Sequence, residues 1–291
     1  MKSIHKTVLL NETIDGLNLN PKSVVVDATF GGGGHSAEIC KRYPDVKIIA
    51  LDQDASTSKN KNPECEIIFH NENFKDLDKV LRGEKVDGII FDLGLSSDQL
   101  ENSGRGFSFM KDEPLIMTMK ENPSPEDVTA YDVVNTWGEE NLANIIYGYG
   151  EERYSRKIAK GIVEARKKAK IKTTGELVRI IESAVPNAYR KGRINCATKT
   201  FQAIRIAVND ELGALKTGLS KGFDSLKEGG RMAVISFHSL EDRIVKKFYK
   251  EKEKENLAKL INKKVILASG EEIKNNPRSR SAKLRILEKI K

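Results

Sequence analysis

The chain has 291 residues, of which 38% are hydrophobic and 32% are charged, and its formal net charge is +8. This length and hydrophobic content allow one or two domains with a buried core, which excludes a disordered chain, a collagen-like chain and a disulfide scaffold. The apolar runs fall far short of the roughly 18 residues of a membrane span, and residues 1–20 lack the apolar segment of a signal peptide. We therefore expect a cytoplasmic protein.

The three cysteines, Cys40, Cys65 and Cys196, are odd in number and form no CxxC pair. We therefore expect neither a disulfide framework nor a zinc or other metal site.

Positive charge is concentrated in two regions of the chain. Residues 151–205 and residues 243–291 each carry a net charge of +10, which leaves a net charge of −12 on the rest. Solvated helix faces would explain either region by itself, but two basic regions on an acidic body favour a nucleic-acid partner. Charge does not distinguish DNA from RNA.

The first hundred residues alternate apolar runs with helix-compatible segments such as residues 35–42. Each run is almost continuously apolar, as expected of parallel strands that are buried on both faces, and the segments between them can hold the crossover helices that such strands need. The four runs are residues 23–29, 46–52, 65–70 and 86–92.

The pattern becomes helical from residue 106 to residue 195, where we find no convincing strand. Residues 154–168 form a basic amphipathic helix, and Thr173 with Glu176 has the spacing of a capping box that begins another. Apolar residues spaced by three and four predict one long helix over residues 197–226.

The strand pattern resumes at residues 229–236, and residues 264–268 and 282–287 predict a closing hairpin. The sequence thus predicts an α/β fold in which an all-α domain is inserted into a Rossmann-like, mostly parallel sheet domain. The predicted domains are residues 1–105 with 206–291 for the sheet domain, and residues 106–205 for the inserted basic domain.

Open parallel sheets bind ligands outside the carboxyl ends of their strands, and polar residues stand at four of the five predicted ends. Asp27 precedes the run Gly31 to Gly34, where the backbone can approach a ligand closely, and Asp52 follows Asp27 by 25 residues. A spacing of about 20 is typical of a carboxylate that binds an adenosine ribose. These residues indicate an adenosine-containing cofactor, with NAD and S-adenosylmethionine equally compatible and a structural turn as the alternative.

The glycine loop is not a Walker A loop, because His35-Ser36 stands where Lys-Ser or Lys-Thr would follow, and it matches GxGxxG imperfectly. More specific motifs occur in order along the chain, above all Arg-Gly-Phe-Ser-Phe at residues 105–109 and Phe-His-Ser-Leu-Glu-Asp-Arg at residues 237–243. The others lie at residues 5–12, 27–36, 92–100, 149–152, 200–212 and 276–285. Over essentially its whole length the chain resembles the bacterial small-subunit (16S) rRNA cytosine-N4 methyltransferase family.

The resemblance implies a class I S-adenosylmethionine-dependent methyltransferase fold. The glycine loop would pass the methionine moiety, Asp52 would accept hydrogen bonds from the ribose, Phe74 would face the adenine, and Asp92 would lie near the sulfonium. The cofactor residues that the resemblance implies are Gly33, Gly34, His35, Asp52, Phe74, Asp92 and Gln99.

The implied substrate is a cytidine in the decoding region of the small-subunit rRNA, either in free rRNA or in the assembled subunit. The enzyme itself would be a monomer or a homodimer. The exocyclic amine of cytosine is a poor nucleophile, so catalysis needs hydrogen-bond acceptors, alignment and an unstacked base. The catalytic candidates are Asp92, Ser96, Ser97, Asn209, His238 and Asp242, with a structural role as the alternative for His238. Asn276, Arg278 and Arg280 resemble phosphate or sugar contacts.

Two stretches depart from the family pattern. Ile116, Thr118 and Lys120 replace three charged residues of the family, and Asn195-Cys196 replaces a His-Pro pair. Because the motifs for the cofactor are intact, the departures bear on the substrate. A diverged paralogue with another RNA substrate or a non-catalytic RNA-binding role is therefore an alternative; the glycine loop by itself would also allow a nicotinamide-dependent oxidoreductase.

Overall fold

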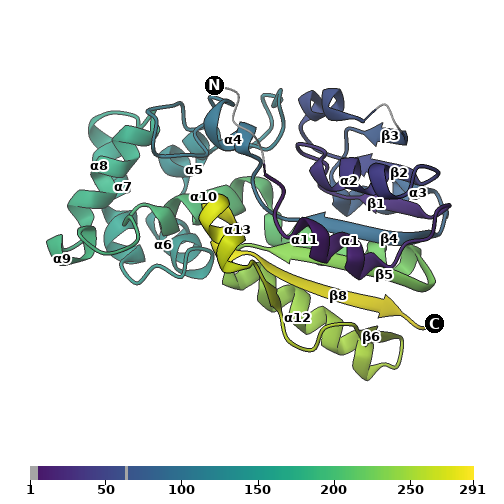
Figure 1. Cartoon of the computed structure of the whole chain (residues 1–291). Coiled ribbons are helices and arrows are strands. Elements are labelled where there is room, and N and C mark those ends of the chain that lie inside the picture. Colours follow the sequence, from purple (N-terminus) through teal and green to yellow (C-terminus); the bar gives the residue numbers. More distant parts are fainter. Residues whose placement is uncertain (1–5, 63–64) are drawn as a thin grey trace. The chain divides into compact units, whose positions relative to one another are not determined.

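The computed structural model describes residues 6–62 and 65–291 and forms two compact units. The sheet unit comprises residues 1–96 and 212–291, and the helical unit comprises residues 97–211. The helical unit is therefore an insertion between the fourth and fifth strands (Figure 1). Its boundaries fall at 96/97 and 211/212, where the sequence places them at 105/106 and 205/206.

The described part of the sheet unit contains one eight-stranded sheet in the order β3-β2-β1-β4-β5-β8-β6, with β7 paired to β8. The first five strands are parallel to one another, which confirms the predicted open sheet. Strand β8 is antiparallel to β5 and to β7, and its pairing with β7 is that of the predicted closing hairpin. The strands are β1 (Val24–Asp27), β2 (Lys47–Leu51), β3 (Glu66–His70), β4 (Val86–Asp92), β5 (Leu226–Ser236), β6 (Ala258–Leu260), β7 (Ile266–Leu267) and β8 (Lys283–Lys289).

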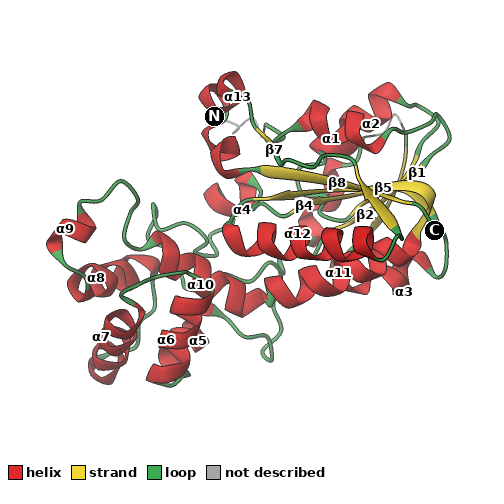
Figure 2. Ribbon diagram, turned by 90° about the horizontal axis from the view of Figure 1, so that it is seen from below, coloured by secondary structure: helices red, strands yellow, loops and turns green. Residues whose placement is uncertain are grey.

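Helices cover both faces of this sheet (Figure 2). In β4, Ile89 and Phe91 join the core beneath α3, α11 and α12, whereas Ile90 joins the core beneath α1 and α2. Because both faces are buried, every position of a central strand favours an apolar residue, which explains the continuous apolar runs. The elements are α1 (Leu10–Leu17), α2 (Gly34–Arg42), α3 (Leu77–Leu81), α11 (Glu211–Ser225), α12 (Ser239–Lys254), α13 (Gly270–Asn275) and the 3₁₀ helices η1 (Ala55–Asn60), η2 (Phe74–Asp76) and η3 (Pro277–Ser281).

The helical unit is built from short helices. Its basic helix α7 buries Ile158 and Ile162, and the predicted capping box of Thr173 and Glu176 begins α8. The helices are α4 (Ser97–Glu101), α5 (Ala130–Thr136), α6 (Glu139–Gly148), α7 (Ser155–Lys168), α8 (Thr174–Ala184), α9 (Asn187–Arg190) and α10 (Thr198–Asn209). None of the helices in the part of the chain described is both long and apolar enough to cross a bilayer.

The prediction of one helix over residues 197–226 is wrong. The chain breaks at Asp210, which adopts a left-handed φ of 47° and donates its backbone N–H to Ile206, so that α10 and α11 are separate helices. Both helices bury apolar stripes, so the three-and-four spacing continues across the break and conceals it.

The expectation of no disulfide is also corrected by the structure. Cys40, near the end of α2, and Cys65, just before β3, are joined by a disulfide across a Cα–Cα distance of 5.5 Å. Both residues belong to or pack against the same hydrophobic core. Counting cysteines could not reveal this pair, because only the fold brings α2 and the start of β3 together.

Candidate active site

The carboxyl ends of β1, β2 and β4 place three carboxylates at one edge of the sheet. Strand β1 lies between β2 and β4, with Asp27 in register with Ala50 and Ile90. Because parallel strands end at the same edge, Asp27, Asp52 and Asp92 follow neighbouring strands there. This edge lies entirely within the sheet unit.

The glycine loop is folded onto the end of β2. Gly31 donates its N–H to Asp52 Oδ2 at 2.7 Å, and Asp54 donates its N–H to Asp52 Oδ1 at 2.8 Å. Gly31 and Gly33 adopt left-handed φ values of 48° and 71°, which glycine allows at little cost. Burial raises the pKa of Asp52 to about 6, although the two backbone hydrogen bonds oppose that rise.

Asp27 is a functional candidate that the sequence marks only as the start of the glycine motif. Its side chain is buried and accepts a hydrogen bond of 2.7 Å from the Ser36 hydroxyl. Burial raises the pKa of Asp27 to about 6, although the Ser36 hydrogen bond opposes the rise. The signal that identifies it is an acidic residue that ends a buried strand directly before a glycine loop.

Asp27→Asn is expected to stabilise the free protein in a pH-dependent way. The folded-state pKa is raised from 3.8 to about 6, so the wild type loses stability as the pH rises through this window and carries the full cost above about 6. The variant does not titrate, so its advantage in unfolding free energy should grow by about 2 kcal/mol between pH 4 and pH 7 (somewhat under two pKa units). Urea unfolding of both proteins at the two pH values measures it; an advantage that does not change with pH would contradict the assignment.

Asp92, at the end of β4, has a buried carboxylate oxygen that accepts no hydrogen bond from the described residues. This oxygen is Oδ1, and the Oδ2 atom lies 3.8 Å from His35 Nδ1. Burial, together with the charges of Asp27 and Glu241, raises the pKa of Asp92 to about 7, although a hydrogen bond from the Gly94 backbone opposes the rise. A buried acceptor without a donor costs roughly 1–3 kcal/mol, so this atom fits a site that a ligand completes.

Phe74, in η2 after β3, is the aromatic candidate of the site. Its ring packs edge-on against Phe91 of β4, with 5.5 Å between centroids, and stays partly exposed. A Cβ atom at Gly218 in α11 would lie only 2.7 Å from the Phe74 ring, so the glycine is needed for this close approach. The ring therefore has a fixed position beside the sheet edge.

His238 and its neighbours lie after β5, where α12 begins. His238 is the N-cap of α12, and its Nδ1 accepts the Glu241 N–H at 3.4 Å while its Nε2 lies 3.1 Å from Glu241 Oε1. The buried Glu241 also accepts the Phe237 N–H at 2.9 Å. The Nδ1 contact is that of a helix cap, whereas Nε2, like Asp92 Oδ1, is buried and has no hydrogen-bond partner among the described residues. Glu241 was missed in the sequence, although the spacing of three from His238 is that of a capping box.

Asp242 is held by basic residues of β8. Its carboxylate accepts a hydrogen bond of 2.8 Å from Arg285 Nε and lies 3.6 Å from Lys283 Nζ. Burial by itself would raise the pKa of Asp242, but the two cations outweigh it, so that the pKa lies below the usual range. Asp242 is therefore ionised and already paired within the sheet unit.

Three sequence candidates belong to the helical unit. Ser97 begins α4 and Gln99 follows in the same helix, while Asn209 ends α10. The Asn209 side chain accepts the Met119 N–H and donates to the Met117 carbonyl, both at 2.8 Å, so it holds the loop that carries the family departures.

The main chain of that departing loop makes the contacts with Arg105 and Asn209, and the Lys120 side chain pairs with Asp127. Arg105, which is buried, donates through Nη1 to the carbonyls of residues 118, 119 and 120 at 3.0–3.4 Å. The anchors therefore do not require the family's charged side chains at residues 116, 118 and 120. In the second departure, Asn195 accepts the Ala197 N–H at 2.8 Å just before α10, and Cys196 is buried.

The RNA-contact candidates near the carboxyl-terminal strand differ in exposure. Arg278 and Arg280 lie exposed in η3, while the Asn276 amide donates to the Lys6 carbonyl at 2.9 Å. Their surface position fits phosphate contact.

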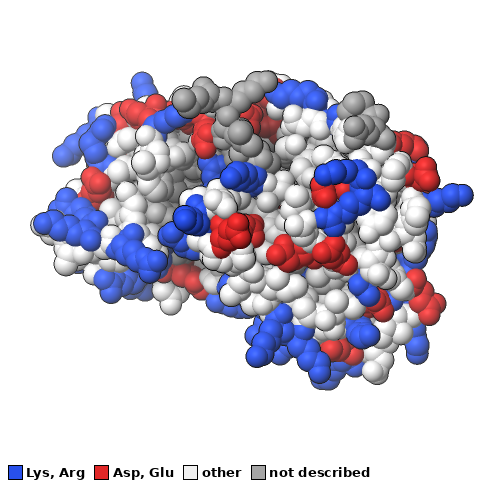
Figure 3. Space-filling model, viewed as in Figure 1, with Lys and Arg blue, Asp and Glu red and all other residues white. Residues whose placement is uncertain are grey.

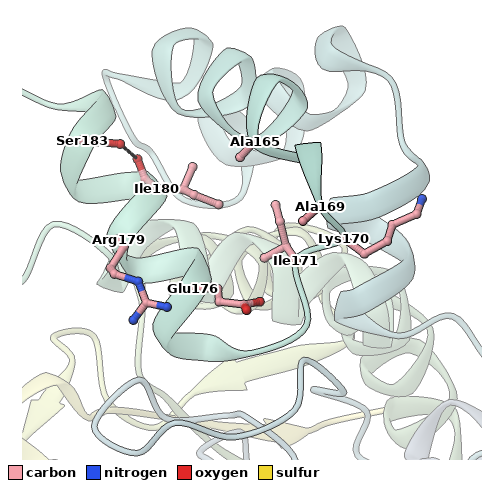
Figure 4. Close-up of a pocket in the computed structure, with 8 residues that line it drawn as sticks. All are labelled: Ala165, Ala169, Lys170, Ile171, Glu176, Arg179, Ile180 and Ser183. Atoms are coloured by element: carbon pink, nitrogen blue, oxygen red, sulfur yellow. Dashed lines mark hydrogen bonds between the residues drawn. The ribbon is translucent and has the colours of Figure 1, made fainter. Parts of the chain in front are cut away.

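A separate hollow of about 300 Å³ lies between α7 and α8 of the helical unit (Figure 4). Alanine and isoleucine side chains make much of its lining, and Lys170 and Arg179 also border it. Glu176, its acidic residue, already accepts the backbone N–H groups of Lys172 and Thr173. Glu176 thus serves as the capping-box residue at the start of α8.

Comparison with known proteins matches residues 2–290 of this chain to the MraW methylase family. Proteins named ribosomal RNA small subunit methyltransferase H are similar to it over their full length: one from Clostridium botulinum (strain Kyoto / Type A2) is 48% identical, with all of both chains covered. Another, from Ehrlichia chaffeensis, is 49% identical, with 99% of this chain and 100% of that protein covered. The chain therefore belongs to the MraW methylase family and is a methyltransferase of the class I, S-adenosylmethionine-dependent type.

Proposed function

We propose that the protein transfers the methyl group of S-adenosylmethionine to the exocyclic N4 amine of a cytidine in the decoding region of 16S rRNA. The observation that carries the proposal is the buried, unpartnered Oδ1 of Asp92 at the sheet edge, beside the glycine loop of a methylase family member. The names of the full-length relatives support the small-subunit rRNA as substrate. The loop at residues 116–120, which departs from the family pattern, is held through its main chain by Arg105 and Asn209. Because these contacts do not depend on the replaced side chains, they favour an active enzyme over a non-catalytic paralogue.

The sheet edge fits the cofactor. The loop that would carry the methionine moiety needs glycine at two positions for its own packing, because a Cβ at Gly33 would lie 2.9 Å from the Asn60 carbonyl oxygen and one at Gly34 would lie 1.8 Å from the Thr7 hydroxyl oxygen. Asp52 would bind the ribose hydroxyls, and Phe74 would contact the adenine. His35 completes the proposed cofactor set of the sheet unit, in which Asp92 faces the cationic end. Gln99, in the helical unit, stays a prediction.

When bound, the cofactor supplies a methyl carbon that is made electrophilic by its sulfonium. Asp92 accepts a hydrogen bond from the N4 amine, which orients the nitrogen lone pair toward that carbon. Methyl transfer would form an N–C bond as the S–C bond breaks, and the amine would lose one proton, to Asp92 or to solvent. A carboxylate with a pKa of about 7 is suited to this exchange near neutral pH.

The remaining base-pocket candidates stay predictions. Ser96 follows β4 closely enough to share its edge of the sheet, and Ser97 and Asn209 belong to the helical unit. For His238 and Asp242, the contacts within the sheet unit indicate that they position α12 and β8 around the site.

The affinity for S-adenosylmethionine is expected to depend on pH more strongly than the affinity for S-adenosylhomocysteine. Asp92 attracts the sulfonium only when ionised, so affinity for S-adenosylmethionine should rise as the pH passes through the pKa of about 7 and should fall below it by up to about tenfold per pH unit. S-adenosylhomocysteine lacks the sulfonium charge but shares the contacts of Asp52. Calorimetric titration of both ligands from about pH 5.5 to about pH 8 measures the difference; parallel curves for the two ligands would contradict the role of Asp92.

The substrate assignment is tested by transfer of a radiolabelled methyl group. The acceptors are small ribosomal subunits lacking their native modifications, protein-free 16S rRNA and large subunits. We expect label in one or both small-subunit acceptors and none in large subunits. Label confined to large subunits, or to none of the three while the cofactor still binds, would refute the substrate.

A further inference from the structure

The helical unit contains a locked cluster of aromatic and basic side chains that the site described above does not use. At its centre Glu152 is fully buried and accepts hydrogen bonds from the Tyr189 hydroxyl at 2.6 Å and from the Tyr154 N–H at 2.8 Å. These bonds tie the segment before α7 to α9, although the two are far apart in sequence. Burial and the neighbouring Glu152 both raise the pKa of Tyr189, so its hydroxyl stays protonated and remains a donor.

We call the hydrogen bond between Tyr189 and the buried Glu152 the lock, and it holds two tyrosine rings beside an exposed guanidinium. Arg153 lies over the rings of both Tyr154 and Tyr189, 4.8 Å from each centroid, and the rings themselves pack edge-on at 4.9 Å. Arg153 is nevertheless exposed, and both tyrosines are partly exposed. An arginine on the surface loses much entropy when it binds, and one that two rings already hold loses less.

Cations surround this cluster. The segment 186–195 contains three basic residues and no acidic residue, and Arg190, Lys191 and Arg193 are all exposed. Lys157 of α7 is exposed too, and its ammonium lies 5.9 Å from the Tyr154 ring. Figure 3 shows Lys and Arg side chains gathered over the helical unit.

We propose that these residues form a platform for single-stranded RNA: the guanidinium of Arg153, held over the rings of Tyr154 and Tyr189, stacks on an unpaired base, and Arg190, Lys191 and Arg193 bind the adjoining phosphates. Aromatic rings and guanidinium planes next to phosphate-binding cations are the combination by which proteins hold unpaired RNA. A merely solvated basic face needs no buried carboxylate and no pair of rings to orient one arginine. The inference rests on the proposed function, which supplies an RNA partner, and gives that RNA a second contact outside the sheet edge.

The test compares two triple variants of equal charge change. The platform variant is Arg190→Ala, Lys191→Ala and Arg193→Ala. The control is Lys22→Ala, Lys41→Ala and Lys85→Ala, whose residues are exposed at the amino end of the sheet, the end opposite the site. Binding of a fluorescent single-stranded decoding-region oligonucleotide is measured as a function of salt, and methyl transfer to small subunits is measured for KM and kcat.

The platform variant should bind the oligonucleotide at least about tenfold more weakly, with a salt slope lower by about 2, because about 0.7 is lost per phosphate contact of a single strand. Its KM should rise similarly while kcat and cofactor affinity stay within about twofold. Binding and KM equal to those of the control variant would overturn the platform. A variant that binds the oligonucleotide normally and yet raises KM for subunits would also overturn it, since that pattern indicates a ribosomal-protein contact.

Tyr189→Phe examines the lock itself. It keeps the ring and removes the hydroxyl that binds Glu152, so KM should rise about threefold with kcat unchanged. Tyr147→Phe, at an exposed tyrosine of α6 that lies outside the platform, removes the same atom and should behave as the wild type. Equal KM values for both variants would show that the lock is not used. If the wild type binds the oligonucleotide through the platform but methylates no rRNA, the proposed function fails and the platform stands.

Discussion

Asp92→Asn is expected to lower the rate of methyl transfer by about 10²–10³-fold, which is the usual effect of removing a charged group or a proton acceptor that acts in the transition state. The amide keeps the shape of the carboxylate but loses the charge that faces the sulfonium and cannot take the proton of the amine. Single-turnover transfer to undermodified small subunits, at saturating cofactor, measures the loss in the chemical step.

The same variant should be more stable than the wild type near neutral pH, because the burial that raises the pKa of Asp92 to about 7 is a cost of the charged form. Loss of activity together with a gain in unfolding free energy would distinguish an active-site carboxylate from a structural one. Asp78→Asn is the matched control: Asp78 is exposed, pairs with Lys221, and should be dispensable for transfer. A rate for Asp92→Asn within about threefold of the wild type would remove Asp92 from the mechanism.

Gly33→Ala is expected to weaken cofactor binding at least tenfold, which corresponds to about 1.4 kcal/mol. Gly33 has a left-handed φ of 71°, and a Cβ there would meet the Asn60 carbonyl oxygen, a backbone atom, at 2.9 Å. The loop must therefore shift, and because Gly31 in the same loop donates to Asp52, the ribose site shifts with it. Calorimetric titration with S-adenosylhomocysteine measures the affinity.

Gly83→Ala separates backbone strain from displacement of the loop. Gly83 also has a left-handed φ, of 91°, but a Cβ there would meet nothing within 4 Å. Both variants should lose roughly 1 kcal/mol or more of stability from strain, and only Gly33→Ala should lose affinity. Equal affinities for the two variants would show that the glycine loop does not form the cofactor site.

The sheet was predictable from the sequence because its strands are buried on both faces. Ile89, Ile90 and Phe91 serve two different cores, so no polar position interrupts the run, and the strand order then follows from crossover rules. The break at Asp210 was not predictable, because neither Gly nor Pro marks it and the apolar spacing persists on both sides. The unit boundary at 211/212 lies beside this break.

The sequence predicted those site residues whose location follows from their position at the end of a strand. Asp27, Asp52 and Asp92 were found because carboxyl ends of parallel strands share an edge. What the sequence could not show is how each carboxylate is used: the unpartnered Oδ1 of Asp92 differs from the paired oxygens of Asp242 only through burial and neighbours. The tie between Glu152 and Tyr189 joins residues 37 positions apart and likewise appears only in the fold.

The most direct measurement is the mass and position of the product formed from a methyl-d3 donor, with wild type and Asp92→Asn assayed side by side on small subunits that lack native modifications. We predict trideuterated N4-methylcytidine at one cytidine of the decoding region with the wild type, and at most a trace with Asp92→Asn. Deuterium on a ring carbon or on another base, or equal yields from the two proteins, would contradict methyl transfer to a cytosine amine at the Asp92 edge of the sheet.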